Sequence, residues 1–212
     1  MTGTSEAEEL GGRERILAAA LEIMESQSEA AIRFSDVAAR AGVTPGVITY
    51  HFGTREQLVA EVHAHRFSGA VLADLFTMRA LLDTTEDLEG FFVGVAQLTG
   101  AVVDATRAEQ RMLRIVSIAA THGREDLTER IRARATELLD GFAELIADAQ
   151  ARGFLDPTLD PRAIATFVQA YALGITVLDL VQTPVSRGEL ADLVHRLLWK
   201  LRGTCDSDAA AL

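Results

Sequence analysis

The positions of the prolines leave a long interval of this chain free to form helices. They stand at 45, 157, 161 and 184, so residues 46–156, more than half of the 212-residue sequence, contain none. Proline interrupts helix interiors, and apolar residues recur here at spacings of three and four. Aromatic residues are few, and no Asn-Gly or Asp-Gly turn separates alternating apolar runs. The sequence therefore predicts an all-α fold.

The apolar periodicity predicts about nine helices. They cover residues near 13–27, 35–41, 45–53, from 54 onward, 86–104, 107–121, 125–152, 161–181 and 187–202. Thr44 and Thr54 stand where N-caps are expected. The predicted organisation is an acidic disordered tail (1–12), a small helical unit (13–60), a larger helical unit (61–202) and a flexible tail (203–212).

Charge and cysteine content narrow the function classes. The net charge of −11 excludes bulk attraction to nucleic acid or to an anionic membrane, so any binding to DNA needs a local basic face. The single cysteine, Cys205, rules out an intramolecular disulfide and a cysteine metal cage, which fits a reducing cytoplasm. We expect a cytoplasmic protein because the acidic N-terminus lacks a signal-peptide pattern and no uncharged apolar run reaches about 18 residues.

Residues 34–58, FSDVAARAGVTPGVITYHFGTREQL, carry the most informative pattern. Gly42 permits a sharp turn between two short helices, and Thr44-Pro45 begins the second with an exposed N-terminus. Residues 33–55 hold three arginines against one aspartate, a net charge of +2. This predicts a helix-turn-helix whose second helix enters the major groove. The alternative is a plain packing unit with a solvated basic face.

The same residues resemble the TetR family of bacterial transcription regulators. The matching positions are Val37-Ala38-x-x-Ala41-Gly42-Val43, Thr44-Pro45-Gly46, His51-Phe52 and Thr54-Arg55-Glu56-x-Leu58, within residues 14–62. The resemblance implies a three-helix DNA-binding domain followed by a helical domain for ligand binding and dimerisation. It also implies close approach of DNA at Gly46.

The resemblance assigns further DNA contacts position by position. Those expected to touch phosphates are Thr44, Tyr50, His51 and Arg55, and those expected to reach base edges are Pro45, Val47 and Thr49. Arg33, outside the family pattern, is expected to add a phosphate contact. Two positions depart from the family pattern. Thr49 stands where many members have tyrosine, with Tyr50 beside it, and Arg33 replaces a capping serine or threonine. Which of Thr49 and Tyr50 contacts DNA stays open.

The larger unit is expected to hold an apolar ligand cavity. Its candidate residues are His65, Phe91, Phe92, Val95, Met112, Ile115, Val116, His122, Phe142, Ile146, Phe167 and Tyr171. His65 lies on the predicted apolar stripe of the helix from residue 54, formed by Leu58, Val62, His65, Gly69, Leu72 and Phe76. Ordinary core packing is the alternative for all these residues.

A homodimer is expected because the helix near 161–181 is apolar on every side. The predicted interface residues are Phe167, Tyr171, Ile175, Leu178, Asp179, Leu190, Val194, Leu197, Leu198 and Leu201. Asp179 is expected to make an interface hydrogen bond. The alternative is an internal helix of a monomer.

The sequence thus predicts a DNA-binding regulator and favours a repressor. A hydrophobic or amphiphilic small molecule is expected to release it from an inverted-repeat operator. Its partners are double-stranded DNA, that effector and a second copy of the chain. No cofactor, metal or catalytic residue is expected, since His63-x-His65 and Asp192-x-x-His195 make poor metal pairs. A protein-binding module and an all-α enzyme are the alternatives.

Overall fold

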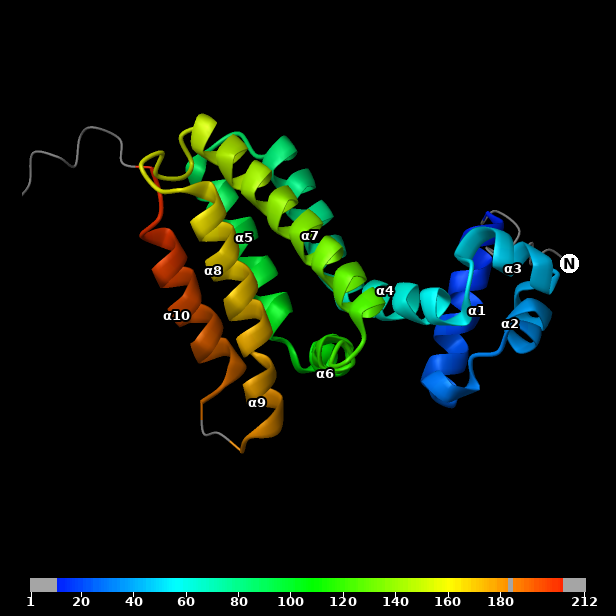
Figure 1. Cartoon of the computed structure of the whole chain (residues 1–212). Coiled ribbons are helices and arrows are strands. Elements are labelled where there is room, and N and C mark those ends of the chain that lie inside the picture. Colours follow the sequence, from blue (N-terminus) through cyan, green and yellow to red (C-terminus); the bar gives the residue numbers. More distant parts are fainter. Residues whose placement is uncertain (1–10, 183–184, 204–212) are drawn as a thin grey trace, which may run out of the picture. The chain divides into compact units, whose positions relative to one another are not determined.

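A computed structural model describes residues 11–182 and 185–203, and these are almost entirely helical (Figure 1). The α-helices of this part are α1 (Gly12–Ser26), α2 (Phe34–Ala41), α3 (Pro45–Phe52), α4 (Arg55–Thr84), α5 (Leu88–Val103), α6 (Ala108–Ala119), α7 (Glu125–Ala151), α8 (Pro161–Gly174), α9 (Thr176–Leu180) and α10 (Arg187–Trp199). Two short 3-10 helices, η2 (Glu29–Ala31) and η3 (Ala105–Arg107), precede α2 and α6. The all-α prediction is confirmed.

The helix expected over 161–181 is two helices, so the described part of the chain has ten α-helices where about nine were predicted. The break falls after Gly174, a poor helix former, which is followed by the β-branched pair Ile175-Thr176. The Ile175 N–H still bonds back to Tyr171, so the two segments follow closely on each other.

The helices form two compact units. Among the described residues, the first unit comprises those up to Phe67 together with Ser117–Arg132, and the second comprises Ser68–Val116 and those from Ala133 onward. The sequence placed a boundary near residue 60 and assigned 117–132 wholly to the larger unit. The expected tails lie mostly outside the described residues, but Gly12 already starts α1 and Gly203 donates a hydrogen bond to the Phe154 carbonyl.

The first unit is built around the packing of α1, α2, α3 and the start of α4. Its apolar core includes Ile16, Ile23, Val37, Ile48 and Leu58, all of which are essentially inaccessible to solvent. Removing this much apolar surface from water is the main force holding these short helices together, because helices of eight residues are marginal alone.

The second unit is held together by an aromatic cluster. The ring of Phe91 stacks on Phe154 at 5.2 Å and meets Phe92 edge-on at 5.4 Å, and Phe92 contacts Trp199 at 4.7 Å. These contacts join α5 to the segment after α7 and to α10, and Figure 1 shows α5, α8 and α10 packed along one another.

The predicted apolar stripe of α4 is correct only at its start. Leu58 and Val62 are buried, but His65 and Leu72 are exposed and Phe76 is 65% exposed. The stripe fails because residues 55–67 belong to the first unit and residues 68–84 to the second, and each portion buries its own face. A single 3.6-residue period cannot describe both.

One described stretch, Pro161–Leu180, is long and apolar enough to cross a membrane by length and composition, with a mean hydropathy of 1.6. The bent pair Leu88–Val103 and Ala105–Ala119 would pass only if counted as one span. This corrects the expectation that no stretch approaches spanning length. Core helices of soluble proteins pass the same test, so the finding is weak support for a membrane segment.

Candidate DNA-binding surface and ligand cavity

The turn between α2 and α3 has the geometry that the sequence predicted. Gly42 ends α2 in the left-handed region, with φ 64° and ψ 38°, and the Val43 N–H bonds back to the Ala38 carbonyl at 3.1 Å. A residue with a side chain is strained in this conformation. Thr44 then stands at the N-cap of α3 and Pro45 at its first position, although the Thr44 side chain makes no capping hydrogen bond.

Packing fixes the inner face of α3. Ile48 and Phe52 are buried against the core of the first unit, and the Arg13 guanidinium lies over the Phe52 ring at 5.2 Å from its centre. The start of α4 is capped reciprocally, since the Thr54 hydroxyl accepts from the Gln57 N–H while the Gln57 side chain accepts from the Thr54 N–H. Packing at Ile48 and Phe52 therefore fixes α3, and the cap at Thr54 fixes the start of the helix that follows it.

The outer face of α3 is open to solvent. Tyr50 is 85% exposed, and Thr49 is exposed with its hydroxyl donating to the Pro45 carbonyl at 3.2 Å. The other expected contact residues of this face are also exposed, apart from a half-buried Val47; they are Thr44, Pro45, Gly46 and His51. A row of exposed side chains on a rigidly packed helix is the arrangement that reads a DNA groove.

The arginines around the helix-turn-helix differ in the contacts that they make. Arg33 is exposed at the N-cap of α2 and makes no capping bond there. Arg40 lies 3.4 Å from the Glu22 carboxylate, an exposed pair that contributes little to stability.

Arg55 has a structural role that the sequence did not reveal. Its Nε donates to the Ile32 carbonyl and its terminal nitrogen donates to the Glu29 carbonyl, both at 2.7 Å. The guanidinium thus ties the start of α4 to the segment that leads into α2. A phosphate contact would have to share a side chain already bonded to the backbone.

A polar cluster lies within the first unit beside these residues. The buried His63 places Nε2 2.9 Å from the Glu29 carboxylate and Nδ1 3.3 Å from the Ser117 hydroxyl, and Arg124 donates to the same carboxylate at 3.0 Å. Burial raises the pKa of Glu29, but hydrogen bonds from His63 and Arg124 outweigh it and hold the pKa below its ordinary value. His63, not the exposed His65, is therefore the buried histidine of α4.

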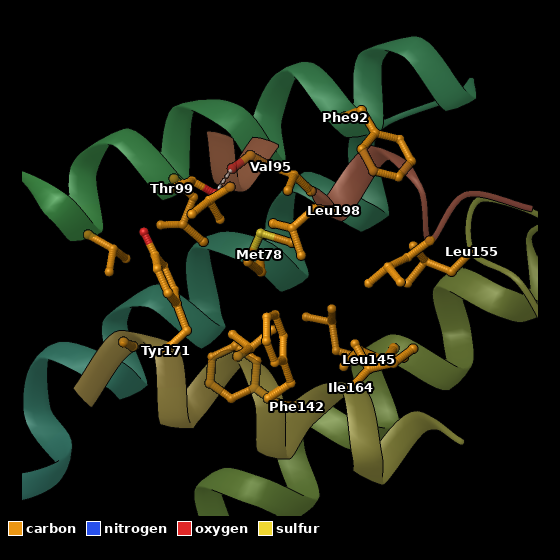
Figure 2. Close-up of a pocket in the computed structure, with 18 of the residues that line it drawn as sticks. Met78, Phe92, Val95, Thr99, Phe142, Leu145, Leu155, Ile164, Tyr171 and Leu198 are labelled. Atoms are coloured by element: carbon orange, nitrogen blue, oxygen red, sulfur yellow. Dashed lines mark hydrogen bonds between the residues drawn. The ribbon is translucent and has the colours of Figure 1, made fainter. Parts of the chain in front are cut away.

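An apolar cavity of about 130 Å³ lies inside the second unit (Figure 2). Seven of the twelve residues predicted for a ligand site line it, namely Phe91, Phe92, Val95, Phe142, Ile146, Phe167 and Tyr171. The sequence missed several further lining residues, because their spacing is that of ordinary core; they include Met78, Leu145, Ile164 and Leu198.

The remaining five predicted residues do not line this cavity. His65 and His122 are exposed residues of the first unit, and Val116 is exposed on α6. Met112 and Ile115 also lie on α6, whose arginines bond to α8 and α9: Arg111 reaches Asp179 and Arg114 reaches Gln169. No residue of α6 lines the cavity, and the contacts of this helix with α8 and α9 include these arginine hydrogen bonds.

Two hydroxyl groups belong to the cavity residues, and they are used differently. The Thr99 hydroxyl donates to the Val95 carbonyl of its own helix at 2.8 Å. The Tyr171 hydroxyl is buried and has no hydrogen-bond partner among the described residues. Burial also raises the pKa of Tyr171, so the phenol stays a neutral donor.

The predicted interface residues are divided between surface and core. Phe167 and Leu197 are about half exposed, at 52% and 51%, whereas Ile175 and Val194 are buried. The other predicted residues are half-buried; they are Tyr171, Leu178, Asp179, Leu190, Leu198 and Leu201. The run 161–181 is thus not buried on both faces within one chain.

Asp179 is bonded within the chain. Its carboxylate takes two hydrogen bonds from Arg111, at 2.7 and 2.8 Å, and one from Arg187 at 2.6 Å. The side chains of Asp179 and Arg111 are 7% and 8% exposed. The bonds from Arg111 and Arg187 lower the pKa of Asp179 below its ordinary value, despite its burial.

These features define a class: a helix-turn-helix protein that also carries a helical unit with an internal apolar cavity. Residues 16–62 match the sequence profile of the bacterial regulatory proteins of the tetR family, and residues 93–177 match that of the tetracyclin repressor-like C-terminal domain. The chain belongs to the TetR family of transcription regulators, which are DNA-binding proteins.

Solved structures support the same fold. A TetR-family transcriptional regulator from Mesorhizobium loti is 18% identical, with a TM-score of 0.66 over 94% of this chain and 100% of that one. The fatty acid degradation regulator FadR from Bacillus halodurans is 16% identical, with a TM-score of 0.59 and coverages of 90% and 95%. The multidrug binding protein EbrR is 23% identical, with a TM-score of 0.60 and coverages of 93% and 98%. A comparison with curated proteins found no significant match.

Proposed function

We propose that this protein is a transcriptional repressor that binds an inverted-repeat operator as a homodimer and leaves it when a small molecule enters the cavity. The observation that carries the proposal is the exposed outer face of α3 on a buried, well-packed inner face. Family membership favours a regulator over an enzyme.

The DNA part of the proposal assigns base contacts to the outer face of α3 and phosphate contacts to its flanks. Arg33 and Tyr50 are exposed and available for such contacts. Because the whole chain carries −11, adhesion to random DNA should be weak and binding should depend on this local surface. Thr49 and Tyr50 are both exposed, so either one is free to approach a base.

The test is a selection of bound fragments from the source genome, performed with purified protein at two salt concentrations. We expect enrichment of an inverted repeat with half-sites about 34–36 Å apart, or a longer multiple of the helical turn, and weaker binding at higher salt. Absence of enrichment at both concentrations would contradict DNA binding and favour a protein-binding role.

The dimer is supported by the apolar surface of the last three helices. Exposed apolar side chains on α8, α9 and α10 include Phe167, Val177, Leu180, Leu193 and Leu197. Exposed apolar clusters of this kind are typical of protein interfaces. This surface also explains the apolar character of Pro161–Leu180 without a membrane. Sedimentation should give twice 22.9 kDa at micromolar concentration, and a monomer would contradict the proposal.

Ligand control is supported by the cavity itself. Similar folds include a protein described as multidrug binding and another described as a regulator of fatty acid degradation, so apolar effectors are consistent with this architecture. A ligand releases DNA only by binding the DNA-incompetent state more tightly. A thermal-shift screen of diverse apolar compounds should yield stabilisers, and those compounds should lower operator affinity. A screen without any stabiliser would count against ligand control.

A further inference from the structure

The chemistry of the cavity walls restricts what can bind there. The residues that line the cavity are apolar except for the hydroxyl-bearing Thr99 and Tyr171, and none of them carries a charge. An ion transferred into such surroundings loses its hydration and gains no counter-ion, which strongly disfavours charged ligands. The cavity therefore selects against carboxylates and ammonium groups.

The Tyr171 hydroxyl is the one polar group of the described cavity wall with an unused donor. Thr99 already donates to the Val95 carbonyl, whereas Tyr171 has no partner among the described residues. In Figure 2 the Tyr171 ring rises from α8 with its hydroxyl toward α5, at the end of the cavity where Thr99 lies. Buried hydroxyl groups are nearly always hydrogen-bonded, so an orphan in a cavity wall points to a missing ligand.

We propose that the effector is a neutral, mainly apolar molecule whose single hydrogen-bond acceptor accepts a hydrogen bond from the Tyr171 hydroxyl. This inference rests on the proposed ligand control and names the chemical class of the ligand. The volume of about 130 Å³ sets its size. An engineered apolar cavity of about 150 Å³ holds benzene, so this cavity is of the size that encloses a single ring.

Three compounds of nearly the same shape separate the relevant properties. Acetophenone is neutral and has a carbonyl acceptor, α-methylstyrene replaces that carbonyl with a carbon–carbon double bond, and benzoate replaces the acetyl group with a charged carboxylate. Calorimetric titration of the full-length protein without DNA gives the affinity for each. We expect acetophenone to bind at least about 100-fold more tightly than benzoate at pH 7, because the charge cannot be solvated in the cavity.

The hydrogen bond is isolated by comparing two variants. Tyr171→Phe removes only the hydroxyl, and it should lower the ratio of acetophenone to α-methylstyrene affinity by about three- to tenfold. Thr99→Val is the matched control, because that hydroxyl is already bonded within α5; its ratio should stay within about twofold of the wild-type value. Circular dichroism verifies that both variants are folded.

Three results would overturn the inference: benzoate binding within about tenfold of acetophenone, a ratio unchanged by Tyr171→Phe, or no binding of any compound at millimolar concentration. The operator complex is measured separately. If acetophenone binds as predicted but leaves operator affinity unchanged, the ligand class stands and the proposed role of the cavity in DNA release fails.

Discussion

Replacing Gly46 with alanine should stabilise the protein and weaken its binding to DNA. Gly46 lies in the first turn of α3, and a Cβ built there meets only the Thr44 hydroxyl oxygen, at 3.8 Å. The fold therefore has room for a side chain, and alanine favours a helix over glycine by about 0.5–1 kcal/mol. For a chain of this size, that gain raises the melting temperature by roughly 1–4 °C.

The loss of DNA affinity follows from the proposed docking. If DNA approaches the backbone at Gly46, an added methyl group overpacks that contact by about 1–3 kcal/mol, which weakens operator binding by about five- to 150-fold. Chemical denaturation followed by circular dichroism gives the stability, and fluorescence anisotropy with the selected operator gives the affinity.

Two further glycines serve as controls. Gly100→Ala adds a methyl group in α5 where no atom lies within 4 Å, so it should stabilise the protein and leave DNA binding unchanged. Gly42→Ala should destabilise, because this residue has φ +64°. If Gly46→Ala binds the operator as tightly as wild type does, DNA does not approach the backbone at Gly46 as proposed. If Gly46→Ala is less stable than wild type, the fold does not have room for a side chain there.

The other predictions concern charge and recognition. Asp179→Asn should lower the free energy of unfolding at pH 7 by about 3 kcal/mol, because it leaves the buried Arg111 without a counter-ion. The pKa of Asp179 is lowered in the fold, so this stabilisation exists above the unfolded pKa of about 3.9 and is lost as pH falls. The difference in unfolding free energy between Asp179→Asn and wild type should therefore vanish in acid. The control Asp192→Asn, at an exposed position, should show no such difference at any pH. Arg55→Ala should lower the free energy of unfolding by about 1–3 kcal/mol, because two backbone carbonyls lose their donor. If stability is unchanged and the slope of log DNA affinity against log salt concentration falls by about one unit, Arg55 instead makes only a phosphate contact. Thr49→Ala should change the preference at one base pair by about 1–3 kcal/mol, whereas equal loss on every sequence would exclude base reading.

The short-range features of the first unit could be predicted from the sequence because local chemistry determines them. Gly42 is needed for a left-handed turn, Pro45 fits the first position of a helix, and Thr54 caps the start of α4. Each depends on backbone preferences within a few residues. The same holds for most helix bounds.

Long-range partners could not be predicted in this way. The periodicity of α4 placed His65 on the buried stripe, but His63 is the buried residue, bonded to Glu29 and Ser117. No local sequence pattern indicates that Ser117 belongs to the first unit, because Ser117 lies more than fifty positions after His63 in the chain. Likewise, Asp179 was expected at an interface, while Arg111, far away in sequence, provides its partner.

The cavity was only partly predictable because cavity walls and solid cores use the same residues. Phe91, Phe142 and Tyr171 were identified from their bulk, but Met78 and Leu198 have the spacing of ordinary core positions. Whether facing apolar side chains leave a space depends on packing details that periodicity does not contain.

That the outer face of α3 binds DNA specifically is a claim that a double substitution of its exposed side chains can test. Thr49→Ala/Tyr50→Ala removes no core contact, and Gln97→Ala on α5 provides an exposed control. Fluorescence anisotropy titrations at two salt concentrations should measure the affinity for the inverted repeat recovered in the genomic selection and for a duplex of scrambled sequence. We expect the double variant, folded as wild type, to lose its preference for the repeat and the control to keep it. A double variant that discriminates between the two duplexes as well as wild type does would contradict the claim.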